Sequence, residues 1–245
     1  MSHFIIPDWP ALDRVKAYTS LRFNGHSKLP FADFNLCFKV GDDPDAVTAN
    51  RQQLMQELEL KRAPAWLNQV HGTTAINADT ISNETPDADA SYTSTPGVVC
   101  TILTADCLPI FLCNEQGNQV AAIHAGWRGL LNGVIANTVG SLTPPYDYWM
   151  AWLGPAIGPA SFEVGNEVRE QFIQADPQYS DAFRETKANT WLADLYAIAK
   201  RQLAKLDIKR VYGGGLDTYT DATNFYSYRR DQGKTGRMVS LIWFS

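Results

Sequence analysis

The sequence predicts a single domain in which several mixed β-sheets are covered by helices. Short apolar runs of strand length are separated by turn residues, and a few longer segments carry apolar residues at helical spacing. Hydrophobic residues make up 45% of the 245 residues and charged residues 19%, which is ordinary for a protein with a buried core. Because the chain has no internal repeat, no low-complexity linker and no break in composition, we expect one domain over residues 1–245.

The first third of the chain combines strand-like runs with one helix and one acidic segment. Asp43 supplies an N-cap and Pro44 the first residue of a helix that ends near Leu60. Residues 77–94 carry acidic and hydroxyl side chains without lysine or arginine, so we interpret them mostly as a solvated surface loop, although Asp89 could be structural. Strand-like patterns occupy residues 4–6, 15–23, 34–40 and 65–70.

The rest of the chain contains the predicted central strands and their covering helices. Continuous apolar character indicates buried strands at residues 98–103 and 108–113, and further strands are predicted at 119–123 and 148–153. Patterning and flanking turn signals predict helices at residues 130–139, 167–175 and 191–206. A short strand at 211–212 precedes a last strand at 237–244, which is apolar on both faces and should therefore lie inside a sheet.

Charge and hydropathy narrow the possible partners and location. A net charge of -5 and a pI of 5.3 leave no basic surface for a nucleic-acid backbone, although a few arginines could still bind a small anion. The first residues lack the basic and apolar regions of a secretory signal. The apolar run 98–113 is interrupted by Asp106 and Pro109 and is too short to span a bilayer. We therefore expect a cytoplasmic protein with no membrane partner.

Three side chains that can bind a metal are predicted at strand ends, beside glycine or proline: His71, Cys107 and His124. One thiolate and two imidazoles suit zinc, and catalytic zinc sites commonly use three protein ligands and leave a fourth position to water or substrate. Cys107 as nucleophile and His124 as base would instead form a thiol hydrolase. Spacing alone leaves both interpretations open. The other cysteines lie in apolar runs, where we expect packing roles: Cys37, Cys100 and Cys113.

Five motifs from about Arg22 to the C-terminus occur in the order of one bacterial family. They are Asn68-Gln-Val-His-Gly72, Thr104-Ala-Asp-Cys-Leu-Pro109, His124-Ala-Gly-Trp-Arg-Gly129, Leu153-Gly-Pro-Ala-Ile-Gly158 with Phe162-Glu-Val-Gly165, and Phe225-Tyr-Ser-Tyr-Arg-Arg230 with Thr235-Gly-Arg237. The sequence thereby resembles the YfiH-like family, also labelled multicopper polyphenol oxidoreductase (laccase), peptidoglycan editing factor or purine nucleoside phosphorylase. The chain departs from the family pattern at two places. It has Asn24-Gly25 where family members often have two glycines, and Ala160-Ser161 where they often have cysteine-rich residues. Neither departure touches the candidate ligands.

The resemblance implies a fold, a metal site and an activity. It makes His71, Cys107 and His124 the zinc ligands, so Cys107 would be a bound thiolate. It implies an α+β fold shared with toxin-type cysteine deamidases. It also implies phosphorolysis of adenosine, inosine and methylthioadenosine, with adenosine deamination. Purine nucleosides and phosphate are then the expected partners, and oligomeric state stays open.

The laccase label conflicts with the histidine count. A multicopper oxidase needs a mononuclear site and a trinuclear cluster held largely by imidazoles, and this chain has four histidines. A single site of two histidines and one cysteine could still take copper, which binds such ligands more tightly than zinc does. Copper-dependent oxidation would then be a side activity.

Further residues are candidates for substrate chemistry. Phosphorolysis depends on positioning phosphate against the ribose, and Arg128, at a predicted helix N-terminus, and Arg22 are candidate phosphate ligands. Asp106 is a candidate acid or base, and Trp127 could stack on a purine or belong to the core. The usual zinc-deaminase signature, H-x-E with P-C-x-x-C, is absent, so deamination would need an independent site design. The alternatives are a thiol hydrolase or amidase acting on peptidoglycan precursors, and a role in binding alone.

Overall fold

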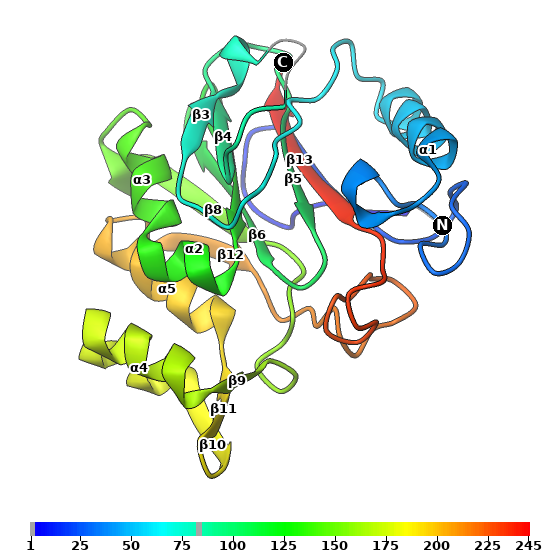
Figure 1. Cartoon of the computed structure of the whole chain (residues 1–245). Coiled ribbons are helices and arrows are strands. Elements are labelled where there is room, and N and C mark those ends of the chain that lie inside the picture. Colours follow the sequence, from blue (N-terminus) through cyan, green and yellow to red (C-terminus); the bar gives the residue numbers. More distant parts are fainter. Residues whose placement is uncertain (1–2, 82–84) are drawn as a thin grey trace.

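Three β-sheets organise the part of the chain that this computed structural model describes, residues 3–81 and 85–245 (Figure 1). The largest has the strand order β12-β8-β6-β7-β4-β3. Its outer pairs, β12 with β8 and β3 with β4, are parallel and the others antiparallel, so the sheet is mixed as predicted. Its strands are β3 (Ala75–Asn77), β4 (Ala90–Thr93), β6 (Leu108–Asn114), β7 (Val120–Ala125), β8 (Trp149–Leu153) and β12 (Arg210–Gly213).

A four-stranded sheet with the order β1-β2-β13-β5 packs against the large one. Strand β13 lies inside this sheet, antiparallel to both β2 and β5, which confirms the central position predicted for the last strand. A smaller sheet, β10-β11-β9, projects beside α4 at the bottom of Figure 1. These strands are β1 (Phe4–Ile5), β2 (Val15–Ser20), β5 (Cys100–Thr104), β9 (Glu163–Gly165), β10 (Phe183–Lys187), β11 (Thr190–Ala193) and β13 (Met238–Phe244).

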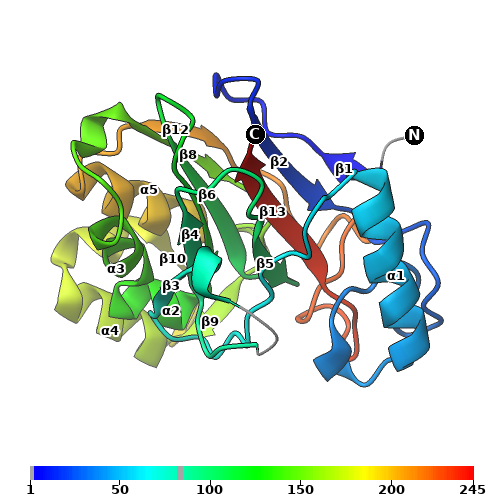
Figure 2. The same ribbon diagram turned by 90° about the horizontal axis from the view of Figure 1, so that it is seen from above.

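Helices cover the outer faces of the paired sheets (Figure 2). On β6, Ile110 and Leu112 join the core under the helices, while Phe111 and Cys113 point the other way, into the core between the sheets. This alternation explains why the strand is apolar on both faces. Helix α1 lies on one side of the molecule, and the other described helices, α2 to α5, lie on the opposite side. The helices are α1 (Pro44–Glu57), α2 (Trp127–Asn132), α3 (Val134–Gly140), α4 (Asn166–Ala175) and α5 (Leu195–Lys205), with 3-10 turns η1 (Phe38–Val40), η2 (Ala78–Thr80), η3 (Tyr146–Tyr148) and η4 (Pro177–Ala182).

Two strands predicted near the N-terminus are wrong, because side chains replace the backbone ladder there. In the segment 34–40, the amide of Asn35 bonds both the N–H and the carbonyl of Cys37, and the chain then turns into η1. The segment 65–70 follows the edge of β5 but makes only isolated bridges, at Ala65 and Asn68. Cys37 is consequently half-buried instead of packed in a strand, whereas Cys100 and Cys113 are buried as expected.

The predicted boundaries of two helices are also wrong, each for a local reason. The segment 191–206 begins as β11, and the helix starts only after Asp194, whose carboxylate caps it by accepting from Ala197 N. The helix predicted at 130–139 starts at Trp127 and is interrupted by Gly133, which adopts a left-handed φ of 91°. No helix in the described residues is long and apolar enough to cross a membrane.

The acidic segment 77–94 is not simply a surface loop. Ala90–Thr93 form β4, inside the large sheet, and Asp89 directly before it is fully buried with 0% exposure. Asp79 is exposed, as expected for a loop. Residues 82–84 of this segment lie outside the described part of the chain. The structure therefore has the mixed α+β fold that was predicted, with a buried carboxylate at Asp89 in a segment whose composition mostly suggested solvent.

Candidate metal centre

Cys107 and His124 are brought together by the register of one β-hairpin. Strands β6 and β7 pair with Leu108 opposite Ala125 and Pro109 opposite His124. Cys107, one residue before β6, therefore lies beside the end of β7, which is formed by His124 and Ala125 and followed by Gly126. His124 is buried with 4% exposure, and Cys107 is half-buried. The apolar strands thus fix the relative positions of these two side chains.

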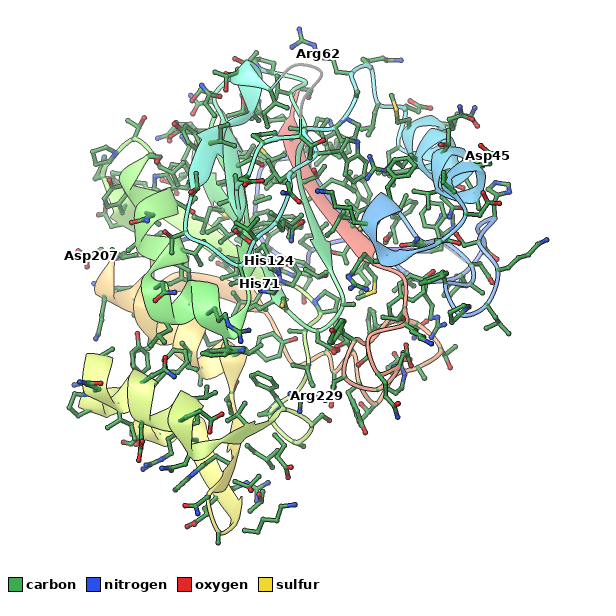
Figure 3. All side chains as sticks on the ribbon, viewed as in Figure 1. Asp45, Arg62, His71, His124, Asp207 and Arg229 are labelled. Carbon is green, nitrogen blue, oxygen red and sulfur yellow. The ribbon has the colours of Figure 1, made fainter. Side chains whose placement is uncertain are left out.

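His71 reaches the same point from the loop before β3. Figure 3 shows His71 and His124 next to one another in the middle of the molecule, and their ring centroids lie 4.8 Å apart. The candidate ligand atoms of His71, Cys107 and His124 all lie within 4.8 Å of one another, so together they could hold one metal ion. A Cβ at Gly126 would lie 2.9 Å from His71 Nδ1 and 3.1 Å from Cys107 Sγ, so this position has no room for a side chain.

Asp89 connects the two histidines through hydrogen bonds to its buried carboxylate. Its carboxylate accepts a 2.7 Å hydrogen bond from His124 Nδ1, which leaves Nε2 of that ring for Cys107 or a metal. It also accepts from the backbone N–H groups of Val70, His71 and Gly72, at 3.2, 3.0 and 2.6 Å. His71 has a left-handed φ of 58° in this turn. A carboxylate behind a ligating imidazole is the usual outer-shell arrangement of metal sites.

The cluster shifts the pKa values of its own members. Burial opposes ionisation of the Cys107 thiol, but the adjacent His124 and His71 outweigh it and lower the pKa of Cys107 to about 6. Burial likewise opposes the charged form of His124, but Cys107 and Asp89 outweigh it and raise its pKa to about 9. Burial would also raise the pKa of Asp89, yet its bonds from His124 and the turn hold that pKa below the ordinary value. Without a metal, these mutual contacts favour the thiolate of Cys107 and the imidazolium of His124.

Asp106 lies next to Cys107 but uses its carboxylate to fasten the C-terminal segment. Oδ1 accepts from the Thr218 hydroxyl at 2.6 Å, and Oδ2 accepts from the Ser227 hydroxyl at 3.0 Å and from Arg229 N at 2.7 Å. Its backbone has a φ of 93°, which a non-glycine residue rarely adopts. Three donors on one carboxylate indicate an anchor, and they compete with the acid or base role predicted for Asp106.

The cluster opens into a cavity of about 540 Å³ whose walls carry four cations. Among the described residues, none of the four forms an ion pair with a carboxylate. Arg128 contacts the ring of Trp127 at 4.3 Å, so the predicted phosphate and stacking candidates both line the cavity. The other three cations have no local signal that separates them from surface residues, because they reach the cavity from loops that meet only in the fold. The four are Lys39, Arg128, Arg229 and Arg237.

Arg22 is the one predicted site residue that does not line this cavity. Its guanidinium donates to the carbonyls of Ala32 and Ala222, at 3.2 and 3.1 Å, and lies 4.8 Å from the ring centre of Tyr226. These contacts explain Arg22 as a tie between the N-terminal and C-terminal segments. Its position gives no support to the predicted phosphate contact.

The remaining histidines stand apart from the cluster. His3 lies 2.7 Å from Glu57 and packs against Phe4 and Phe34, and His26 is exposed. In the described part of the chain, which includes every histidine, one group of three metal-binding side chains comes together. This arrangement agrees with the objection that the chain cannot build a multicopper oxidase centre.

Comparison with known proteins confirms the family resemblance. The family described as multi-copper polyphenol oxidoreductase laccase matches residues 16–245. The chain is 47% identical over 244 residues to a purine nucleoside phosphorylase of Pseudomonas aeruginosa, and 46% identical over 243 residues to the purine nucleoside phosphorylase YfiH of Escherichia coli K12, covering 99% of each chain in both cases. A crystal structure of the Neisseria meningitidis protein NMB0706 superposes with a TM-score of 0.96 at 44% identity, over 100% of both chains.

Proposed function

The chain belongs to the multi-copper polyphenol oxidoreductase laccase family, and from this premise we propose that it is a zinc-dependent purine nucleoside phosphorylase. The observation that carries the proposal is the meeting of His71, Cys107 and His124 in the wall of a cavity that is also lined by cations without a carboxylate partner among the described residues. The similar proteins of P. aeruginosa and E. coli bear the name of this activity. An oxidase with several coppers is not compatible with the histidines of this chain.

The donor set fits zinc. One sulfur and two nitrogens are common zinc ligands, and three protein ligands leave a coordination position for water or substrate. Zinc bound there would act as a Lewis acid that polarises an oxygen of the substrate or water. Copper would fit the same donors, so oxidation of phenols by copper-loaded protein is the expected side reaction.

The chain's own residues would position phosphate and nucleoside. Arg128 is exposed on the cavity wall without a carboxylate partner, so its charge is available to a phosphate oxygen. Positioning of phosphate against the ribose C1′ is the main requirement of phosphorolysis, because it converts an encounter of two molecules into a reaction within one complex. Trp127, held against Arg128, would border the purine. Asp106 would act by keeping the wall at Arg229 in place.

The finer parts of the proposal follow the family resemblance. They are adenosine, inosine and methylthioadenosine as substrates, deamination of adenosine as a second activity, a fold related to toxin-type cysteine deamidases, and one domain over residues 1–245. The missing deaminase signature makes deamination the part that most needs direct measurement.

The test is to incubate purified protein with adenosine or inosine, with and without phosphate, and to quantify free base, ribose 1-phosphate and inosine by chromatography. We expect base release that requires phosphate, from protein carrying about one zinc per chain. Inosine formed from adenosine without phosphate would identify the deaminase. Absence of free base and of ribose 1-phosphate under all conditions would contradict the phosphorylase and leave a role in binding.

A second candidate is a thiol hydrolase acting on peptidoglycan precursors, and the lowered pKa of Cys107 favours it. A thiolate beside an imidazolium is the reactive form of a cysteine nucleophile. Metal-free protein that releases product from a muropeptide precursor, and loses this activity on thiol alkylation, would support it. Activity that requires zinc would speak against it.

A further inference from the structure

The loop that carries His71 leaves the four-stranded sheet at a side-chain contact with β5. Ala65 N donates to Val99 O at 2.9 Å, and the loop then follows the edge of β5. At Gln69 the side-chain amide takes the place of a peptide group. Its Nε2 donates to Leu103 O and its Oε1 accepts from Leu103 N, both at 2.8 Å.

This exchange explains why the segment 65–70 is not a strand. Since the side chain of Gln69 completes the pairing with β5, the main chain after it is free to turn away from the sheet. The turn places His71 at a left-handed φ and points three successive N–H groups at Asp89. Gln69 therefore fixes where the turn begins, and Asp89 fixes where it ends.

Asp89 has a second function in the same position, because it also holds the ring of His124. One buried carboxylate accepts four hydrogen bonds, one from the side chain of a candidate ligand and three from the backbone around another. A shift of the turn at His71 would thus disturb the ring of His124 through a shared acceptor. The packing is tight at Gly72, where a Cβ would lie 3.3 Å from Asp89 Oδ2.

We propose that Gln69 and Asp89 form a clamp that sets His71 and His124 in their metal-binding geometry before a metal arrives. The inference rests on the proposed metal site and assigns both as positioning residues. The need for a clamp is greatest at His71, which is exposed and lies in a loop, whereas Cys107 and His124 are held by paired strands. A loop ordered in advance loses less conformational entropy when the metal binds, so the metal is bound more tightly.

The test measures Zn²⁺ affinity of metal-free protein by competition with a chelating dye, and ligand geometry from the visible spectrum of Co²⁺-substituted protein. Asp89→Asn keeps the size of the side chain but replaces one carboxylate oxygen with an NH₂ group. This group cannot accept the hydrogen bonds that Asp89 receives from His124 and from the backbone of the His71 turn. We expect Zn²⁺ affinity to fall about 10–100-fold and the absorption of a four-coordinate Co²⁺ site to weaken. Gln69→Glu replaces the NH₂ group that donates to Leu103 O with an oxygen that repels it. We expect this variant to lose about tenfold in Zn²⁺ affinity.

The matched control is Asp79→Asn, in η2, whose carboxylate contacts Thr93 at the end of β4 far from Asp89. The Asp79 carboxylate is exposed and accepts from the hydroxyls of Thr93 and Thr95, at 2.6 and 2.9 Å, so the same chemical change is made outside the cavity. This variant should keep the affinity and the Co²⁺ spectrum of the wild type. With zinc saturating, the two clamp variants should lower kcat while the nucleoside KM stays unchanged.

The outcomes separate the clamp from the proposed function. If the wild type binds Zn²⁺ and both clamp variants match its affinity and Co²⁺ spectrum, the clamp is wrong and the metal site stands. If the wild type binds neither ion, the proposed function fails and the clamp fails with it. Should Asp89→Asn not fold, as judged by circular dichroism, the Gln69→Glu result decides alone, because its change lies at the half-buried edge of β5.

Discussion

The two halves of the candidate metal centre are held in place by different means. On one side, Cys107 and His124 belong to the β6–β7 hairpin, where apolar strands and backbone pairing fix their separation. On the other side, His71 sits in an exposed turn that depends on side-chain hydrogen bonds from Gln69 and to Asp89. We therefore expect the hairpin half to be as stable as the core, and the loop half to be loosened without unfolding of the protein.

The largest expected effect comes from removing the hairpin's thiolate. Cys107→Ala should lower Zn²⁺ affinity by more than roughly 100-fold, because loss of an outer-shell partner alone costs about 10–100-fold. Metal analysis after purification should then find zinc in the wild type and none in the variant. His71→Ala, which removes the loop's ligand, should lose zinc as well, with the hairpin undisturbed. Zinc retained at one per chain in Cys107→Ala would contradict the site.

The pH dependence of metal binding reports how many protons the two hairpin residues, Cys107 and His124, hold before zinc binds. Above pH about 6 Cys107 is already a thiolate, so it gives up no proton to the metal, but below pH about 9 His124 holds a proton that zinc must displace. Between these values the pair should release one proton per zinc, and apparent affinity should rise about tenfold per pH unit. Calorimetry in buffers of different ionisation enthalpy measures the proton count. A count of zero at pH 7.5 would show that neither Cys107 nor His124 holds a proton before metal binds, and a count of two would show that both do.

A smaller effect is expected where the two halves touch. In Gly126→Ala the new Cβ would lie 2.9 Å from His71 Nδ1, so the loop must retreat from the hairpin. We expect Zn²⁺ affinity to fall about tenfold, and the Tm of metal-free protein to change by only a few degrees. Gly140→Ala is the control, because its Cβ would meet nothing within 4 Å at the end of α3. Unchanged zinc binding in Gly126→Ala would mean that the two halves are less tightly packed than the structure shows.

The smallest effect concerns the cations, which are predicted to act on phosphate and not on the metal. Arg128→Gln should raise the KM for phosphate about tenfold with zinc content unchanged, because one charge-assisted hydrogen bond is lost. Arg22→Gln should leave that KM unchanged and lower the free energy of unfolding by about 1 kcal/mol, through its lost carbonyl contacts. Initial rates at varied phosphate and urea unfolding measure the two quantities. Equal effects of both variants on the KM would restore Arg22 as a phosphate ligand.

The sequence alone determined the candidate ligands, because their chemistry and their positions at strand ends can be read locally. Cys107 was set apart from the other cysteines by its place between two apolar runs, and His71 and His124 by the glycine motifs around them. The same local patterns predicted the inner position of β13 and the burial of Cys100 and Cys113, since side-chain period and continuous apolar character report burial directly.

Only the tertiary structure decided how these residues are supported. Asp89 lies in a segment whose composition is typical of a solvated loop, so the sequence suggested a structural role for it only as an exception. Asp79, in η2 of the same segment, is exposed to solvent. The burial of Asp89 follows from the pairing of β4 with β7, a contact between distant parts of the chain. Arg22 and Asp106 show the converse, since distant parts of the chain supply the groups that occupy them: Ala32 and Ala222 for Arg22, and residues 218–229 for Asp106. Local sequence specifies what a side chain can do, and long-range pairing decides which of those possibilities remains.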